Sequence, residues 1–346
     1  MAEQKSKPTI EDVANHCGVS VATVSRVVNK SNPVSKELDA KVREAIKALG
    51  FTPRQWTARA KSDTIAMTIP DILNPFYSEI LHGAQEEADR HDFNLVILNL
   101  RPGHKRRKQY LSMLTQAKFA GLIVVGSRIE SEQLLELREQ YNIPIVAAVR
   151  TVESPQFPCI MFDDESPMYQ ATKHLMSLKH TRIAFISGPL EWISAQARLN
   201  GIQKALSEAG LTLPSSLYTW GYPNTENGVQ MTTNLLALPA DERPTAIIAF
   251  NDQIAIGALH AIRLAGLQVP RDMSVVGFDD VKMAAYANPP LTTVSHPKYR
   301  MGQLAVQMLT NLINDVESIT GGVTMLECPL VLRESTAPCT TESTPV

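Results

Sequence analysis

The stretch from residue 20 to residue 29 combines small and hydrogen-bonding side chains in a pattern suited to reading DNA. On a helix, Ser25 and Arg26 would point outward, where a hydroxyl and a guanidinium can donate hydrogen bonds to phosphates. Small outward side chains let a helix lie deep in a major groove. There, apolar groups contact thymine methyl groups and a threonine hydroxyl bonds to a base edge. The other outward residues are Val21, Ala22 and Thr23, predicted to face bases, and Asn29.

Two helices must position these side chains. Thr9 followed by Asp12 has the spacing of an N-cap with an acid in the first turn. Gly18 supplies a sharp corner, and Ser20 caps the second helix. Thr9 and Ser20 can also present backbone N–H groups to phosphates at the helix starts. The apolar residues at helical spacing, predicted to face inward, are Ile10, Val13, Ala14 and Cys17 in the first helix and Val24, Val27 and Val28 in the second.

A helical hairpin in an unrelated globular domain would show the same pattern, so this alternative stays open on these two helices alone. A third segment favours the DNA reader. Ser35 can cap a helix that runs to Leu49 with a buried stripe of Val42, Ala45 and Ile46. Gly50 then ends that helix. Three small helices around a valine-rich centre predict a helix-turn-helix headpiece over residues 1–51.

The order and spacing of T-I-E-D-V-A, G-V-S-x-A-T-V-S-R-V-V-N and V-S resemble the LacI/GalR family of transcriptional regulators. The resemblance covers residues 9 to about 336. It implies a homodimer that binds double-stranded operator DNA, with a two-lobed, periplasmic-binding-protein-like core that binds a small-molecule effector. In such a core the chain crosses between the lobes three times, here expected near Phe162–Ser166, Pro290–Pro297 and Val323–Leu326.

Charge and composition agree with a DNA reader joined to a sensor. Residues 1–62 carry a net charge of +5, and the remaining residues carry −7. The four cysteines lie far apart without C-x-x-C spacing, which is typical of free thiols in a reducing cytoplasm. No signal peptide is recognisable, and no apolar run reaches the length of a membrane span. We therefore expect a cytoplasmic protein that does not contact a membrane.

From residue 64 on, short β-rich runs alternate with amphipathic helical stretches, which predicts parallel sheets covered on both faces. The series is too long for one sheet and indicates two doubly wound lobes, an α/β core over residues 64–336. Residues 52–63 are predicted to be a hinge linker and residues 337–346 a disordered tail. Predicted strands are Ile65–Ile69, Leu95–Leu100, Leu122–Val125, Ile145–Val149, Ile183–Ser187, Tyr218–Trp220, Ile247–Phe250 and Ser274–Phe278.

Ligands of doubly wound folds bind beyond the carboxyl ends of the strands, so side chains that follow strands are the candidates. Phe76 and Tyr77 can stack on a flat ring or a sugar face, although as residues of the next helix they fit the core equally well. The other candidates at this rim are Trp192, Ser194, Tyr222, Asn251 and Asp279.

The resemblance adds two roles. Arg198 of the R-L-x-G motif is expected to reach ligand hydroxyls, and Asp279 is expected to be a binding group. The runs Ile69–Ile80, Gly126–Arg128 and Pro289–Gly302 resemble the cytidine-responsive branch of the family, which implies a nucleoside effector. A sugar effector, a solute-binding receptor and an enzyme of nucleoside or sugar metabolism remain alternatives.

The acidic pairs Asp163-Asp164 and Asp279-Asp280 also admit metal binding or glycoside hydrolysis. Neither acidic pair lies in a calcium-loop pattern, and the role of Asp279 in the family is binding. We therefore predict a ligand-controlled repressor of a catabolic or uptake operon, not an enzyme, without cofactor or metal.

The sequence departs from the family pattern at Val149-Arg150, where many members carry a polar or acidic residue, and also in the hinge and the third helix. Ala60 stands where members carry a leucine that kinks operator DNA, and the linker is three residues shorter. An alanine methyl is too small to hold a base step open, so we expect a weakly ordered hinge with little kinking. Leu38-Asp39 replaces the usual Thr-Arg in the third helix, which should weaken phosphate contact there.

Overall fold

The computed structural model describes residues 9–29, 34–49, 62–100, 119–126, 131–141, 143–149, 157–314 and 322–340. The chain divides into two compact units, Met1–Ser62 and Asp63–Val346. The predicted hinge, apart from residues 62 and 63, lies outside the described residues. The expectations about Ala60 and hinge order are therefore untested.

The described part of the first unit forms helices α1 (Ile10–Cys17), α2 (Val21–Asn29) and α3 (Lys36–Leu49). Thr9 and Asp12 make a reciprocal capping box at the start of α1. Gly18 follows with φ 63°, a left-handed conformation that glycine adopts without a steric cost. The Oγ of Ser20 accepts a hydrogen bond from the N–H of Thr23, and the Oγ of Ser35 accepts one from Leu38. The predicted caps are confirmed.

A small apolar core holds these helices together. The described side chains in it come from all three helices, and no side chain of Ile10 or Val28 is described. Its buried members are Val13, Ala14, Cys17, Val24, Val27, Val42 and Ala45. Each methyl-rich side chain removed from water stabilises the packed state by roughly 1.5–3 kcal/mol, so a handful of valines suffices for a headpiece of this size.

The second unit contains two lobes, each built on a described six-stranded sheet. The first sheet has the order β11-β5-β4-β3-β1-β2, and all its described strand pairs are parallel. Helices α4 (Pro75–Arg90), α6 (Ser131–Tyr141) and α11 (Lys298–Ile313) belong to this N-terminal lobe. Its strands are β1 (Thr64–Ile69), β2 (Asn94–Asn99), β3 (Leu122–Val125), β4 (Ile145–Ala148), β5 (Cys159–Phe162) and β11 (Val323–Leu326).

The second sheet has the order β12-β10-β9-β8-β6-β7 and is parallel except for the pair β10–β12. Its helices are α7 (Glu165–Ser177), α8 (Ile193–Ser207), α9 (Thr225–Leu236) and α10 (Asp252–Leu264), with short 3-10 turns η1 (Ser215–Leu217) and η2 (Lys282–Tyr286). Its strands are β6 (Ile183–Ser187), β7 (Tyr218–Trp220), β8 (Ala246–Ala249), β9 (Ser274–Asp279), β10 (Thr292–Ser295) and β12 (Leu330–Val331).

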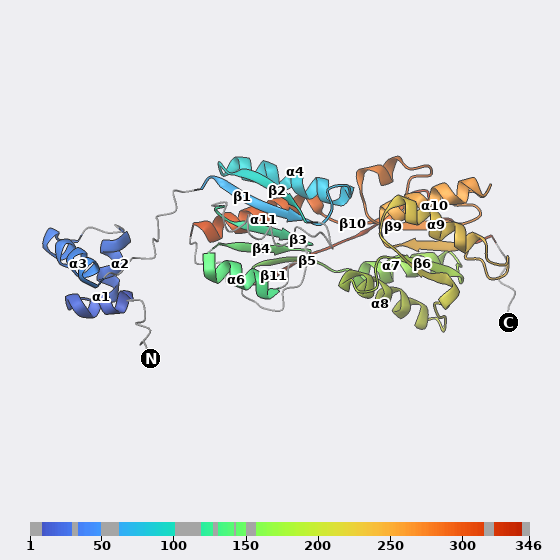
Figure 1. Ribbon diagram of the computed structural model, residues 1–346. Helices are drawn as coiled ribbons and strands as arrows, with labels where there is room; N and C mark the ends of the chain where they lie inside the picture. The colour runs from blue at the N-terminus through green and yellow to red at the C-terminus, as the bar shows by residue number, and fades with distance from the viewer. Residues whose placement is uncertain are drawn as a thin grey trace. The chain divides into compact units, whose positions relative to one another are not determined.

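The described chain crosses between the lobes at three places, as predicted (Figure 1). The first crossing lies between β5 and α7 and the second between β10 and α11, both within the predicted ranges. The third lies between β11 and β12, a few residues later than expected, because Val323–Leu326 pairs with β5 as a strand. All three crossings connect the carboxyl ends of strands in one lobe to the other lobe.

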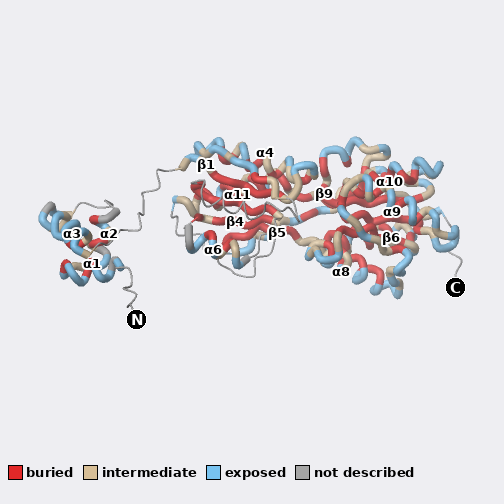
Figure 2. The backbone as a smooth tube through the Cα atoms, in the orientation of Figure 1, coloured by how far each residue is buried: buried red, intermediate tan, exposed pale blue. Residues whose placement is uncertain are grey.

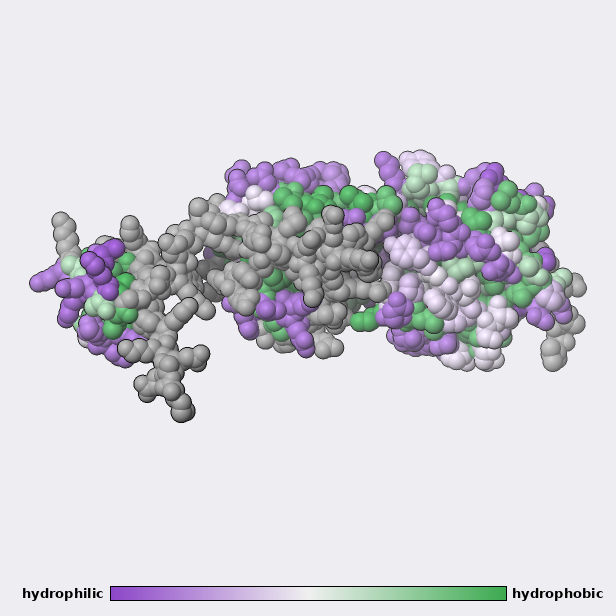
Figure 3. Space-filling view, viewed as in Figure 1, coloured by the Kyte–Doolittle hydropathy of each residue, from purple (hydrophilic) through white to green (hydrophobic). Residues whose placement is uncertain are grey.

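The inner strands of both sheets are buried, whereas the edge strands β2, β7 and β11 are partly exposed (Figure 2). β6, for example, is buried along its whole length, as the near-continuous apolar run of a parallel strand requires. The helices are amphipathic. α4 buries Phe76, Ile80 and Ala84, and its outward side is hydrophilic (Figure 3).

Four strands were not predicted: β5, β10, β11 and β12. β12 has only two residues, too few for a periodicity signal, whereas β5, β10 and β11 are as long as the predicted strands β3, β4 and β8. The predicted helices Phe76–Arg90, Ser131–Tyr141, Met168–Leu178, Ala195–Ala209, Thr225–Leu238, Ile254–Leu264 and Lys298–Ile313 are found within three residues of their expected bounds. A predicted helix at Lys105–Ala117 lies outside the described residues.

The prediction of a disordered tail from residue 337 on is wrong for its first four residues. The N–H of Ala337 donates to the Oγ of Ser274, and the N–H of Cys339 donates to the carbonyl of Leu178. The hydroxyl of Thr340 donates to the carbonyl of Arg271. These bonds to other parts of the chain supply the stabilisation that the polar tail sequence cannot supply by itself. Residues 341–346 lie outside the described part.

Within the described residues, no helix is both long and apolar enough to span a membrane.

Candidate functional site

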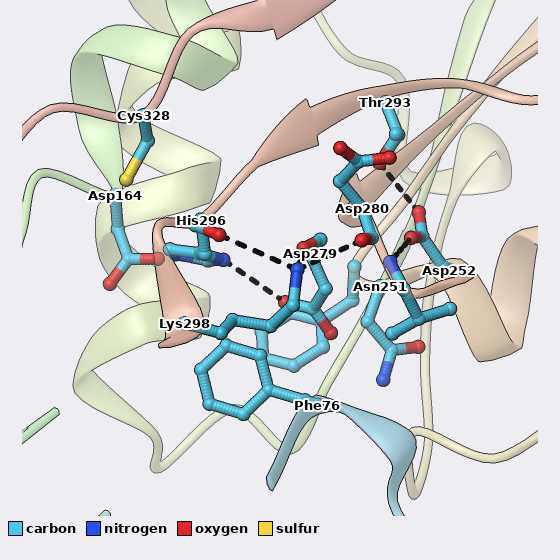
Figure 4. A network of polar contacts seen from close by, with 12 residues as sticks. Phe76, Asp164, Asn251, Asp252, Asp279, Asp280, Thr293, His296, Lys298 and Cys328 are labelled. Atoms are coloured by element: carbon cyan, nitrogen blue, oxygen red, sulfur yellow. Dashed lines mark hydrogen bonds and ion pairs between the residues drawn. The ribbon is translucent and has the colours of Figure 1, made fainter. Parts of the chain in front are cut away.

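The carboxyl ends of the two sheets bring polar side chains from distant parts of the sequence together (Figure 4). Asp164 follows β5, Asp279 ends β9, and His296 follows β10. Arg198 comes from α8 and Lys298 from the start of α11. We call these five residues the interlobe cluster.

Arg198 is the best-fixed member of the cluster. Its side chain is 7% exposed, and its Nε and Nη2 donate to Oδ1 of Asp164 at 2.8 and 2.7 Å. Its Nη1 also donates to the carbonyl of Phe250. The guanidinium lies 4.3 Å from the ring centroid of Phe250 and 3.7 Å from that of Phe278. A cation held between two rings and one carboxylate keeps a single orientation.

Asp279 is buried at the end of β9 with φ 116°, a left-handed region that L residues rarely adopt. Burial raises the pKa of its carboxyl to about 7, against the opposing effects of Arg198 and Lys298. Near neutral pH this carboxyl can therefore either accept or donate a hydrogen bond. A ligand hydroxyl can meet it in both states.

His296 is enclosed by aromatic rings. Its ring centroid lies 4.1 Å from that of Phe162, 4.9 Å from Phe278 and 5.3 Å from Phe76. Burial lowers the pKa of His296 to about 3, so the imidazole is neutral and its 3.4 Å approach to the Asp279 carboxylate is not an ion pair. Neither ring nitrogen has a hydrogen-bond partner among the described residues.

Asn251 and Asp252 follow β8 beside the cluster, and both serve local structure. The Oδ1 of Asn251 caps α10 by accepting from Ile254, and its amide reaches the carbonyl of Pro223. Asp252 accepts from the hydroxyl of Thr293 at 2.6 Å and from the N–H of Val281 at 2.8 Å. Burial raises the pKa of Asp252 to about 8.

The N-terminal lobe contributes aromatic rings. Phe76 is 5% exposed and packs edge-on against Tyr77 and Phe162, so it lies in the core at the base of the interlobe cluster. Burial raises the pKa of Tyr77, and the charge of Asp279 adds to the rise. Tyr222 lies at the rim with 43% exposure, and its hydroxyl donates to Oδ2 of Asp71 at 2.9 Å, linking the lobes.

Trp192 and Ser194 lie at the start of α8, both partly exposed. The ring of Trp192 is 5.9 Å from that of Phe250 and 6.5 Å from that of Tyr222. Trp192 thus lies next to Phe250, one of the two rings beside Arg198, whereas no hydrogen bond joins Ser194 to the cluster within the described part of the chain.

In the headpiece, the predicted DNA-facing residues fall into three groups. Thr9 and Ser20 cap α1 and α2 as described above. Val21 is 42% exposed, Arg26 is exposed, and Thr23 and Ser25 are half-buried, with the Thr23 hydroxyl 2.9 Å from that of Ser20. The side chains of Ala22 and Asn29 are not described. The exposed Val21 and Arg26 share α2, as a recognition helix requires.

Sequence reasoning missed three members of the cluster. Asp164 was considered only as part of an acidic run, and His296 and Lys298 only as parts of a matched run and a helix start. One weak signal was present in the sequence. Asp164 and His296 lie within expected crossings between the lobes, and Lys298 directly follows one. No cluster of His, Cys, Asp and Glu in the described part of the chain is arranged to hold a metal ion.

Comparisons with known proteins agree with this architecture. Residues 9–54 match the family described as "Bacterial regulatory proteins, lacI family". Residues 62–331 match "Periplasmic binding proteins and sugar binding domain of LacI family". The chain is 34% identical over 310 residues to the HTH-type transcriptional repressor PurR of Aliivibrio fischeri, covering 89% of this chain and 92% of that protein.

Two solved structures are similar over almost the whole chain. A transcriptional regulator CelR–cellobiose complex has a TM-score of 0.71 at 30% identity, covering 95% of this chain and 99% of that one. The lac repressor dimer bound to operator and the anti-inducer ONPF has a TM-score of 0.70 at 29% identity, covering 96% and 100%. These comparisons do not confirm the expected likeness to the cytidine-responsive branch. The headpiece and the two-lobed core both match along their length, and the chain belongs to the LacI family of bacterial regulatory proteins.

Proposed function

We propose that this protein is a cytoplasmic, homodimeric repressor whose binding to operator DNA is controlled by a nucleoside bound between the lobes. The observation that carries the ligand site is the interlobe cluster, in which Arg198 and Asp279 lie among aromatic rings. A guanidinium and a carboxyl can donate to and accept from vicinal hydroxyls, and aromatic faces can hold a flat base. The relationship to purine repressors supports a nucleobase-bearing effector.

DNA binding follows from the headpiece. Two such units in a two-fold dimer bind a pseudo-palindromic operator, as the lac repressor dimer is bound to its operator in a related structure. Ligand control follows from lobe geometry: a ligand that binds one lobe arrangement better than the other shifts the equilibrium between them. The hydrogen bond from Tyr222 to Asp71 spans the two lobes, so we expect a change in lobe arrangement to alter it.

A sugar effector is the second candidate, because a related regulator has been solved with cellobiose. A thermal-shift screen separates the two, since a ligand of the native state raises the melting temperature. The panel contains cytidine, adenosine, guanosine, hypoxanthine, ribose and cellobiose. Stabilisation by nucleosides alone supports our proposal, and stabilisation by ribose or cellobiose alone replaces it with the sugar effector. The nucleosides should be recovered unchanged after incubation, because consumption would indicate an enzyme.

Asp279→Asn tests the site itself. We expect the variant to lose affinity for the stabilising ligand in calorimetry, while its DNA binding without ligand stays close to that of the unaltered protein. Asp272→Asn is the matched control, because the partly exposed carboxylate of Asp272 pairs with Arg271 outside the cluster. Equal ligand affinity in Asp279→Asn and the control would place the site elsewhere.

Arg26→Ala tests the DNA interface. Using operator fragments selected from random DNA, we expect gel-shift titrations to show a loss of roughly 1–3 kcal/mol in binding free energy. Arg43→Ala is the control, since Arg43 is exposed on α3 and paired with Asp39. If both variants bind operator equally well, Arg26 does not contact DNA.

A further inference from the structure

Lys298 is an almost fully buried lysine at the first position of α11, with a side chain 2% exposed. Its Nζ donates to the carbonyl oxygens of Asp279 at 2.5 Å, Asp280 at 2.8 Å and His296 at 3.4 Å (Figure 4). An ammonium group has three donors and no acceptor, so these carbonyls match all of its hydrogen-bonding capacity. A carboxylate oxygen of Glu79 lies 3.7 Å away.

The contacts reach from one lobe into the other. Lys298 and Glu79 belong to α11 and α4 of the N-terminal lobe, whereas Asp279 ends β9 of the C-terminal lobe and Asp280 follows it. Within the described residues, this ammonium is therefore a charged link between a helix of one lobe and the ligand-facing end of a strand in the other.

The two aspartates that Lys298 holds are both strained. Asp279 has φ 116° and Asp280 has φ 53°, and two consecutive left-handed residues that are not glycine persist only when their surroundings hold them. Lys298 holds both carbonyls from one side. Arg333 holds the Asp280 carboxylate from the other side at 2.7 Å.

We propose that Lys298 is a positioning residue of the ligand site, whose ammonium fixes the left-handed pair Asp279-Asp280 and thereby determines where the Asp279 carboxyl lies. The proposal rests on the proposed function, in which Asp279 binds the effector. Because Lys298 begins α11, the same contact makes the position of Asp279 depend on the relative placement of the lobes. Effector recognition and lobe placement are thus joined through one side chain.

Lys298 acts on Asp279 by charge as well as by hydrogen bonds. Its positive charge lowers the pKa of the Asp279 carboxyl, opposing the larger effect of burial. The neutral His296 also faces this carboxyl. The other charged or titratable groups around the pair are Glu79, Tyr77, Asp164, Arg198, Asp252, Asp280, Cys328 and Arg333.

The first test needs no ligand. Melting temperatures of the full-length protein and of Lys298→Met are compared between pH 6 and pH 8.5, each with and without Asp279→Asn. Below the pKa of about 7 the carboxyl is protonated, and Lys298→Met loses hydrogen bonds alone. At pH 8.5 it also loses the partner of a buried carboxylate, so the decrease should be larger by about 4 °C or more.

This extra decrease should disappear in the Asp279→Asn background. Lys282→Met, an exposed lysine three residues after Asp279, is the matched control and should change little at either pH. A loss from Lys298→Met that is equal at both pH values and in both backgrounds would show a purely structural lysine and overturn the proposal. Should Lys298→Met fail to fold, Lys298→Arg takes its place. This variant keeps the charge but misplaces the donors, so it should keep the wild-type pH dependence while binding ligand less tightly.

The second test measures cytidine binding by calorimetry at pH 8. We expect Lys298→Met to bind at least tenfold more weakly and Lys282→Met to bind normally. If Asp279→Asn loses cytidine while Lys298→Met keeps it, the positioning role is wrong and the proposed function stands. If Asp279→Asn keeps full affinity, the proposed function itself fails. If cytidine does not bind the unaltered protein, the ligand-free test decides the positioning role.

Discussion

The two lobes of the core have the same strand order but carry different chemistry. The described sheets run β11-β5-β4-β3-β1-β2 and β12-β10-β9-β8-β6-β7, so the corresponding strands occupy the same places. Yet the C-terminal lobe supplies Arg198, Asn251, Asp252 and Asp279, all buried, whereas the N-terminal lobe supplies the rings of Phe76 and Phe162 and a single buried charge of the cluster, Lys298. The fold thus provides two equivalent rims, and the side chains at each rim decide what it can bind.

The last strand of each sheet shows how the lobes are joined. β11 is parallel to β5, whereas β12 is antiparallel to β10. The carboxyl ends of the strands in both lobes lie toward the interlobe cluster. A chain that runs on from one lobe into the other therefore approaches the junction along β11 and leaves it along β12. A segment that runs straight from one lobe into the other is therefore parallel to its neighbour in the first sheet and antiparallel to its neighbour in the second.

The largest expected effect concerns the buried charges of the C-terminal lobe. Arg198→Met leaves the partly buried Asp164 without its partner and removes the cation between Phe250 and Phe278. We expect the free energy of unfolding, measured in urea, to fall by about 3–5 kcal/mol. Arg263→Met on the exposed side of α10 is the control. A loss below about 1 kcal/mol would mean that the buried charges of this lobe contribute little to its stability.

The next prediction tests what the lobes share. A methyl group at Gly302 would overlap the carbonyl of Ile80 between α11 and α4, and one at Gly257 would overlap that of Thr225 between α10 and α9. Each glycine-to-alanine change should therefore cost about 1–3 kcal/mol in urea unfolding. Gln307→Ala, exposed on α11, should change stability by less than about 0.5 kcal/mol. Very unequal costs at the two glycines would show that the helix pairs are not packed alike.

The next prediction, on pH dependence, concerns the C-terminal lobe alone. The pKa of Asp252 is raised to about 8 in the folded protein, so its contribution to stability is fully present below the unfolded pKa near 4 and is lost as pH rises through 8. Asp252→Asn removes this slope but mismatches the donors Thr293 and Val281, at a cost of about 1–3 kcal/mol at pH 5. The cost should shrink by pH 9. Denaturant midpoints across this range measure it, and a constant difference would contradict the assigned pKa.

The smallest expected effect concerns the contact between the lobes at their rim. Tyr222→Phe removes the hydrogen bond from Tyr222 to Asp71, which joins the lobes at an exposed position. We expect a loss of about 1 kcal/mol or less in unfolding free energy, because water replaces an exposed hydrogen bond. Tyr286→Phe, another exposed tyrosine, is the control. A larger loss would show that the rim contact, and not the interlobe cluster, holds the lobes together.

Local signals in the sequence determined the headpiece and most of the core. Thr9, Ser20 and Ser35 cap helices because a side-chain oxygen beside free N–H groups acts over three residues. β1 and β6 are long enough to show as apolar runs. A glycine such as Gly18 directly after a helical pattern predicts a left-handed turn, because glycine adopts this conformation without a steric cost. Each of these signals depends on neighbours in the chain, so the rest of the fold is not needed to recognise them.

Only the tertiary structure decided the composition of the candidate site and the fate of the tail. Asp164 meets Arg198 across 34 residues, and the carbonyls of Asp279 and Asp280 meet Lys298 across 19 and 18. No periodicity records such pairs, because their members lie on different elements. The polar segment around Ala337 is ordered by hydrogen bonds to His180 and Ser274, which lie 157 and 63 residues away in sequence. Contacts of this kind depend on how different elements are placed in the folded chain, and that is why the sequence alone could not assign them.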